Sequence, residues 1–151
     1  MNSIDGQLRE AAEKGDEAKV KALLFDPKCD ALSKDLNGFT ALMLAAGGGH
    51  EACLQLLLPV SDALAKDNTG WTALMYAASY GQASCLSLLL PVSDILAKSD
   101  QENTASHLAT DRGHTHLVML IDAYVVAQSE KLALDSFIPP VASQKNYSLR
   151  I

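Results

Sequence analysis

The sequence predicts an all-α solenoid of stacked helix–turn–helix units joined by β-hairpin-like turns. Three observations predict this fold class. The chain repeats itself at a fixed interval, each copy contains two short stretches with helical apolar spacing, and aromatic residues are scarce (5%) although apolar residues make up 48% of the chain. Leu and Ala must therefore supply most of the buried surface, which suits short, closely packed helices better than a sandwich or barrel.

The repeat is clearest in the middle of the chain. Residues 38–67 and 70–99 align without a gap and are identical at about two thirds of their positions. The step from Thr40 to Thr72 is the same as the step from Thr72 to Thr104, so a weaker copy continues toward the C-terminus, and an earlier copy is visible near the N-terminus. Self-similarity at a fixed period of this length is the signature of a repeat architecture.

The first helix of a unit is well marked in the second copy. Thr40 is a good N-cap, because its hydroxyl accepts a hydrogen bond from a free backbone N–H of the first turn. Leu42, Ala45 and Ala46 follow at helical spacing and share one face. The glycines at residues 47–49 are expected to end the helix, since glycine tolerates the left-handed conformation of a helix C-terminus.

A second helix is expected at about residues 51–58. Its apolar face would carry Cys53, Leu54 and Leu57, and Pro59 follows at once and cannot extend the helix. The stretch after Pro59 is rich in Ser, Asp, Asn and Gly, as is typical of a turn region.

Helices this short are marginal in water by themselves, and stacking each apolar face on the next copy removes the problem. We therefore expect one domain at residues 1–135 and a flexible C-terminal tail at residues 136–151. The four units of the domain are expected at about residues 4–35, 36–67, 68–99 and 100–135.

Several motifs recur in phase with the period. Residues 40–46 read T-A-L-M-L-A-A and residues 72–78 read T-A-L-M-Y-A-A, a turn of the form Asp35-x-x-Gly38-x-Thr precedes the first of these, and a Gly-His pair begins at Gly49. Together they resemble the ankyrin repeat, a unit of about 33 residues with the signature T-P-L-H-x-A. The resemblance implies a protein-recognition module that binds its partner on a concave face formed by turn tips and first helices, and so acts as an adaptor or inhibitor.

The sequence also departs from that family's pattern. Alanine replaces the usual proline at the first helical position, and Met43 and Met75 replace the usual histidine. The Thr–His hydrogen bond typical of the family is therefore expected only between Thr104 and His107.

Charge and cysteine content narrow the classes of partner and compartment. The net charge of −6 argues against a nucleic-acid partner and against an anionic membrane surface, and is compatible with a basic partner protein. The three cysteines are an odd number without a Cys-x-x-Cys pair, which indicates reduced thiols. We expect a cytoplasmic monomer without a cofactor; for a bacterial effector, delivery into a host cell would fit equally.

Aromatic residues at the turns are the best candidates for partner binding. Phe39 and Trp71 occupy the same turn position in successive units, and Tyr76 lies about 200° around its helix from the buried Leu74. Trp and Tyr are favoured as interface anchors because they bury a large area with few rotatable bonds. The predicted site comprises these aromatics, Tyr80 and a polar surround of Asn37, Asn68, Thr69, Ser79, Asn103, Asp111 and Arg112.

Two alternatives stay open at this point. Trp71 and Tyr76 could instead pack against neighbouring repeats as part of the structure. His114 and His116, together with a cysteine, could form a metal-dependent or redox-sensing site, although zinc needs three or four ligands and no further pair has suitable spacing. No Ser or Cys lies in a nucleophile motif, so we do not expect an enzyme.

Overall fold

The structure is a computed structural model, and it describes residues 3–136 of the chain. Eight α-helices and two short 3₁₀ helices make up the regular structure of this part, and it contains no strand. The helices are α1 (Ile4–Lys14), α2 (Glu17–Leu24), α3 (Ala41–Gly48), α4 (Glu51–Leu57), η1 (Leu58–Val60), α5 (Ala73–Ser79), α6 (Ala83–Leu89), η2 (Leu90–Val92), α7 (Ala105–Asp111) and α8 (Thr115–Ser136).

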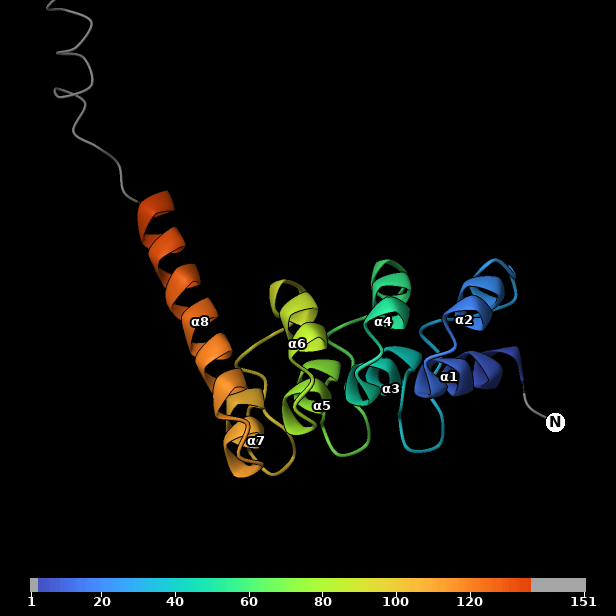
Figure 1. The fold of residues 1–151 in the computed structure, drawn as a ribbon, viewed down its shortest axis with the longest axis horizontal. Helices are drawn as coiled ribbons and strands as arrows, with labels where there is room; N and C mark the ends of the chain where they lie inside the picture. Colours follow the sequence, from blue (N-terminus) through green and yellow to red (C-terminus); the bar gives the residue numbers. More distant parts are fainter. Residues whose placement is uncertain (1–2, 137–151) are drawn as a thin grey trace, which may run out of the picture. The chain divides into compact units, whose positions relative to one another are not determined.

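The helices form two rows. Helices α1, α3, α5 and α7 each pack against the next in one row, and α2, α4 and α6 follow one another in the second row (Figure 1). One helix of each row makes a pair, so repeat 1 is α1 and α2, repeat 2 is α3 and α4, repeat 3 is α5 and α6, and repeat 4 is α7 with the start of α8. The predicted all-α repeat solenoid is confirmed.

The described part of the chain divides into two compact parts, with the boundary after Ile121. The first contains the stacked helices, and the described portion of the second is the remainder of α8, which ends at Ser136. Most of the predicted flexible tail, residues 137–151, lies outside the described residues. No helix in the described range is both long enough and apolar enough to cross a membrane.

The first helices begin and end much as their residues predict. Thr40 Oγ1 accepts a hydrogen bond from the Met43 N–H at 3.3 Å, and Thr72 Oγ1 accepts one from the Met75 N–H at 3.3 Å. Helix α3 includes the first two glycines and ends at Gly48, and Gly49 caps it with a φ of 73°. The three glycines therefore end the helix as predicted, because the last of them adopts the left-handed conformation of a helix C-terminus.

The second helices end one residue before the predicted boundary. After Leu57 the chain tightens into the 3₁₀ helix η1, which includes Pro59 near its start. Proline is tolerated there because the first residues of a helix have no intrahelical partner for their N–H groups.

A continuous apolar interior lies between the rows. Leu42 and Leu74 are completely buried, as are their second-helix counterparts Leu54 and Leu86. The whole set of large, fully buried side chains is Leu8, Val20, Leu42, Met43, Leu54, Leu57, Leu74, Met75, Leu86, Leu89, Leu117 and Ile121. Every repeat contributes to it, so the interior is shared by the stack.

The turns between repeats close as hairpins and also bond to one another. In repeat 3 the Asp67 N–H donates to the Trp71 carbonyl oxygen at 2.9 Å. The Asn68 N–H donates to the carbonyl oxygen of Asn37 in the preceding turn at 3.0 Å, and the Asp100 N–H does the same to Thr69 at 3.0 Å. These bonds hold the turn tips of repeats 2, 3 and 4 in one register.

A second set of hydrogen bonds, made by side chains, joins the start of each of α4, α6 and α8 to the preceding repeat. His50, Gln82 and His114 hold the same position of successive repeats, at the start of α4, α6 and α8. Their side-chain nitrogens lie 2.9, 3.1 and 3.1 Å from the carbonyl oxygens of Glu13, Gly47 and Ser79, respectively. Each contact satisfies a carbonyl at a helix C-terminus, where no intrahelical donor remains.

Candidate functional site: an aromatic cluster at the turns

Four aromatic side chains converge on the surface formed by the turn tips and first helices of repeats 2 and 3. The ring centroid of Tyr76 lies 5.7 Å from Phe39, 4.9 Å from Trp71 and 6.4 Å from Tyr80. We call these four residues the aromatic cluster. All four are candidates from the sequence analysis, and the structure places them together with Tyr76 at the centre.

Local structure explains the convergence. Phe39 and Trp71 each precede the N-cap threonine of a first helix, in loops bonded to each other. Tyr76 and Tyr80 are four residues apart in and just after α5, so their side chains lie one above the other. Their rings are nearly parallel, with an interplanar angle of 9°.

The cluster belongs partly to the fold. Phe39, Trp71 and Tyr76 are half-buried, whereas Tyr80 is 56% exposed. The alternative that Trp71 and Tyr76 pack within the structure therefore holds for part of their surface. The exposed ring of Tyr80 lies beside Gly47 of the preceding repeat, where an added Cβ would come within 3.6 Å of it.

Asp67 holds Tyr76, the centre of the cluster, through a side-chain hydrogen bond. Its Oδ1 accepts the N–H groups of Thr69 and Trp71 at 2.8 and 3.0 Å and the Thr69 hydroxyl at 2.7 Å, and its Oδ2 accepts a short hydrogen bond from the Tyr76 hydroxyl. Burial alone would raise the pKa of Asp67, but these donors outweigh it and hold the pKa below its ordinary value. Burial and donation to Asp67 raise the pKa of Tyr76 far above its usual range.

Two shallow grooves flank Tyr76 and Tyr80. One has a volume of about 310 Å³ and the other about 600 Å³. Both are lined by Phe39, Tyr76 and Tyr80. The smaller groove also touches Glu13, Met43, Leu44, Gly47 and Gly48, and the larger one touches Thr69, Trp71, Asp100 and Gln101.

A comparison with protein-family models identifies the architecture. The model described as ankyrin repeats (3 copies) matches residues 8–99, well over half of the chain. The chain belongs to the ankyrin-repeat family. Ankyrin repeats are generally protein–protein interaction modules, and the family is typically non-enzymatic.

The family match covers repeats 1 to 3 of this ankyrin-repeat protein, and repeat 4 follows it. One family feature reappears there: the Thr104 N–H donates to His107 Nδ1 and the His107 N–H donates to Thr104 Oγ1, both at 3.3 Å. The predicted Thr–His hydrogen bond is confirmed.

The predicted polar surround divides into two groups. Asn37, Asn68 and Thr69 are exposed at the turn tips beside the cluster, and Thr69 lines the larger groove. Asn103, Asp111 and Arg112 belong to repeat 4 and line neither groove, although Asp111 and Arg112 are exposed.

Ser79 lies elsewhere than expected. It is only 2% exposed, and its Oγ has no hydrogen-bond partner, while its carbonyl oxygen receives the ring nitrogen of His114. The end of α5 packs against repeat 4 at this point, so we leave the Ser79 side chain out of the proposed surface.

Several groove residues escaped the sequence analysis, although the repeat register contains the signal for them. Leu44 holds the position of Tyr76 one repeat earlier, and Gln101 holds the position of Thr69 one repeat later. Asp100 corresponds to Asn68 in the same way. Projecting each candidate onto the preceding and the following repeat would have found all three.

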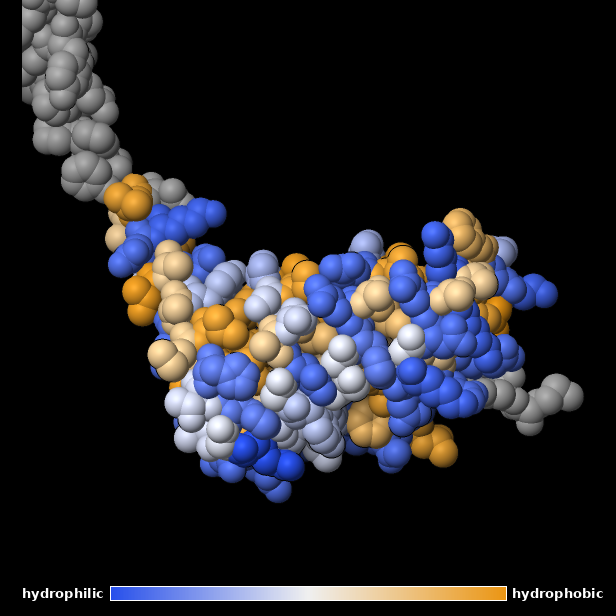
Figure 2. All heavy atoms as spheres, viewed as in Figure 1, coloured by the Kyte–Doolittle hydropathy of each residue, from blue (hydrophilic) through white to orange (hydrophobic). Residues whose placement is uncertain are grey.

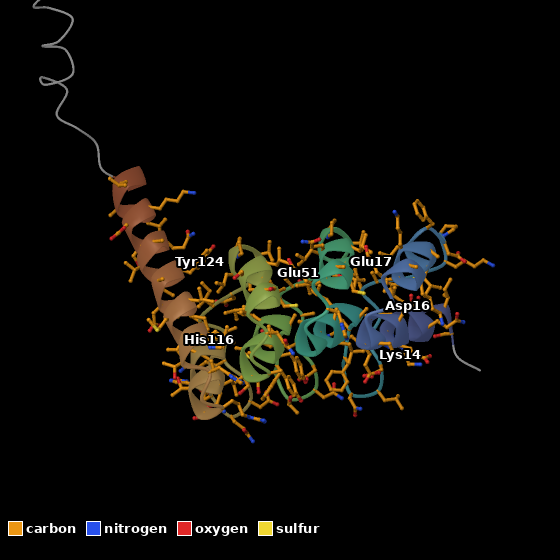
Figure 3. All side chains as sticks on the ribbon, viewed as in Figure 1. Lys14, Asp16, Glu17, Glu51, His116 and Tyr124 are labelled. Atoms are coloured by element: carbon orange, nitrogen blue, oxygen red, sulfur yellow. The ribbon has the colours of Figure 1, made fainter. Side chains whose placement is uncertain are left out.

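In the described part of the chain, His114 and His116 have no third side chain beside them that could complete a metal site. The ring centroids of His114 and His116 are 6.5 Å apart, and His114 is already bonded to the Ser79 carbonyl. Within residues 3–136 no three His, Cys, Asp or Glu side chains gather to hold a metal ion. Figure 3 shows His116 in the first turn of α8.

The cysteines are free thiols with a packing role. Cys53 and Cys85 are 1% and 0% exposed at matching positions of α4 and α6, and Cys29 is half-buried. Burial, with a smaller contribution from Glu51, raises the pKa of Cys85 to about 11. A thiol that stays protonated is a weak nucleophile, so Cys85 behaves as a small apolar core residue.

Proposed function

We propose that the aromatic cluster and its two grooves bind a segment of a partner protein, and that the protein acts as an adaptor or inhibitor through this concave face. The observation that carries the proposal is the concentration of aromatic surface. The chain has one Trp, four Tyr and three Phe, and four of these eight residues meet at the turns of repeats 2 and 3. Trp and Tyr dominate the binding energy of most protein interfaces.

The hydropathy of the surface also supports partner binding. Figure 2 shows apolar residues on the visible face of α1 to α6 as separate spots among polar ones. Tyr and Trp lie near the middle of the hydropathy scale, so this cluster supplies contact area without forming a strongly apolar patch. Such a surface suits a protein that exists both free and bound.

The site is also held in place before any partner arrives. Asp67 fixes Tyr76 and the turn that carries Trp71, and the backbone hydrogen bond from the Asn68 N–H to the Asn37 carbonyl oxygen fixes one turn against the other. Little side-chain and loop entropy is then lost on binding, which leaves more of the contact energy as affinity. We also propose that the protein is a monomer when unbound and that it is cytoplasmic; its three free cysteines support a reducing compartment.

Tyr80→Ala is the sharpest test of this proposal. Tyr80 is the most exposed ring of the cluster, so its removal should leave the free energy of unfolding within about 0.5 kcal/mol. Loss of an aromatic anchor typically costs about 2 kcal/mol or more of binding energy, at least tenfold in Kd. The measurement is the Kd of the captured cellular partner for the wild type and the variant by calorimetry.

Phe25→Ala is the matched control. Phe25 is 79% exposed and follows α2, in the other row of helices, where it contacts a small hollow with Lys21, Leu24 and Leu56. Its loss should leave the Kd unchanged. If Phe25→Ala weakened binding and Tyr80→Ala did not, the partner would bind the second-helix side and the proposal would be wrong. Tyr76→Ala is a poorer probe, because it also removes the hydrogen-bond donor to Asp67 Oδ2.

A further inference from the structure

We propose that the partner segment presents a basic side chain, Arg or Lys, to the aromatic cluster. The inference rests on the proposed function and names the chemistry of the partner. Its first support is the charge of the two grooves. Glu13 is the charged residue that lines the smaller groove and Asp100 is the one that lines the larger, while the buried Asp67 lies beneath Tyr76; no Lys or Arg of the described chain lines either groove.

The ring geometry is the second support. A cation within about 6 Å of an aromatic ring centroid is attracted by the negative face of the ring. Tyr76 and Tyr80 are stacked in parallel and line both grooves, and Trp71, whose ring is tilted by 50° from that of Tyr76, lines the larger one. The Tyr76 hydroxyl donates to the Asp67 carboxylate, which pushes electron density into the phenol ring and strengthens its attraction for a cation.

The protein's own neighbouring cations are engaged elsewhere. Lys34 and Lys66 lie in the turns of the cluster, but their ammonium groups donate to the carbonyl oxygens of Lys66 and Lys98 at 2.8 and 3.0 Å. Lys14 pairs with Glu10 at 2.6 Å and Lys98 pairs with Glu102 at 3.3 Å. The carboxylates of the grooves therefore remain available to a cation from outside, in keeping with a net charge of −6.

The partner segment fits best as an extended peptide. The two grooves share Phe39, Tyr76 and Tyr80 as lining residues, so a chain crossing Tyr80 passes from one groove into the other. An Arg or Lys side chain has an apolar stem that packs on the rings, with a charged end that reaches a carboxylate at the rim. Glu13 and Asp100 offer such a carboxylate in each groove.

The test begins with a selection from a random 12-residue peptide library displayed on phage, against the wild-type protein. The expected result is a set of peptides enriched in Arg or Lys whose binding is lost in Tyr80→Ala. The best peptide is then synthesised with its basic residue intact and with citrulline, a neutral isostere of arginine, in its place (or norleucine for lysine). We expect citrulline or norleucine to raise the Kd at least tenfold.

Charge variants complete the test. Glu13→Gln/Asp100→Asn removes the carboxylates of the grooves and should weaken the peptide at least fivefold. The control Glu17→Gln/Glu51→Gln removes the same net charge from the starts of α2 and α4 (Figure 3) and should leave the Kd nearly unchanged. Equal weakening by both pairs would reduce the effect to long-range net charge and overturn the inference.

The remaining outcomes separate the inference from the function on which it rests. Peptides that lose binding in Tyr80→Ala but contain no basic residue would overturn the basic-partner inference and leave the proposed function standing. Peptides unaffected by Tyr80→Ala, or no selected peptide at all, would count against the aromatic cluster as a peptide site and overturn both.

Discussion

Asp67 combines two tasks that the sequence shows only in part. The Asp-x-x-Gly-x-Thr pattern predicts a turn, and Asp35 and Asp67 fill this role alike by accepting backbone N–H groups of their own turns. Only Asp67 also receives a tyrosine hydroxyl, because the position of Tyr76 is held by Leu44 one repeat earlier. The difference between Leu44 and Tyr76 thus makes Asp67, unlike Asp35, a support of the aromatic cluster.

Asp67→Asn should destabilise the protein by about 1–3 kcal/mol at neutral pH, the range for loss of hydrogen bonds to a buried charged group. The pKa of Asp67 is lowered by folding, so its contribution is complete above the unfolded-state pKa and is lost as the pH falls through the folded pKa. The difference between wild type and variant in urea denaturation should therefore shrink below about pH 4.

Asp35→Asn provides the comparison, since Asp35 accepts the same kind of backbone hydrogen bonds in its turn but receives none from a tyrosine hydroxyl. It should cost clearly less than Asp67→Asn at pH 7. Equal costs for the two variants would mean that the bond from Tyr76 contributes nothing to stability.

At the scale of elements, the helices could be predicted closely and the turn contacts only poorly. The threonine caps and apolar spacing depend on neighbours within one segment, and their helices were found with small boundary errors. The partners Ser79 and His114 are far apart in the chain, and nothing in either segment alone indicates the contact. The burial of side chains at the junctions between repeats could therefore not be predicted from the sequence.

The turn of repeat 4 accepts a side chain at a position where the turns of repeats 2 and 3 have glycine. Gly38 and Gly70 have φ of 85° and 81°, and a Cβ on either would lie 2.8 Å from a backbone nitrogen of the next turn. Glu102 holds the same position in repeat 4 with φ of 64°. A side chain is sterically tolerated there, but the left-handed conformation still costs about 1 kcal/mol.

Glu102→Gly should therefore raise the free energy of unfolding by about 0.5–1 kcal/mol, less whatever the exposed pair with Lys98 contributes. Glu102→Gln removes the same ion pair and keeps the strained backbone, so it should give no gain. Thermal unfolding of the three proteins measures the order. A stabilised Gln variant would point to charge, and not to backbone conformation.

At the scale of the whole molecule, stability comes from the coupling of neighbouring repeats. Leu74 of repeat 3 and Leu117 of repeat 4 are both completely buried, so the core extends into the terminal repeat. The end of the stack is visible at Gly113, where a Cβ would meet nothing, whereas one at Gly81 would meet His114 of the next repeat.

Leu74→Ala should cost about 2–5 kcal/mol, as a core truncation with a repeat on either side. Leu117→Ala should cost less, because the terminal repeat can unfold without breaking the interface between repeats 2 and 3. Urea denaturation followed by circular dichroism gives both values, and hydrogen exchange should show early opening confined to repeat 4 in the second variant. Equal costs would contradict one-sided coupling at that end.

The central claim, that partners bind at the aromatic cluster, has a built-in reporter. Trp71 is the only tryptophan in the chain, so intrinsic fluorescence excited at the indole band observes this site alone when the partner or peptide lacks tryptophan. Binding at the aromatic cluster should produce a saturable change in Trp71 emission whose Kd equals the calorimetric value. Calorimetric binding that leaves Trp71 emission unchanged through saturation would contradict this claim.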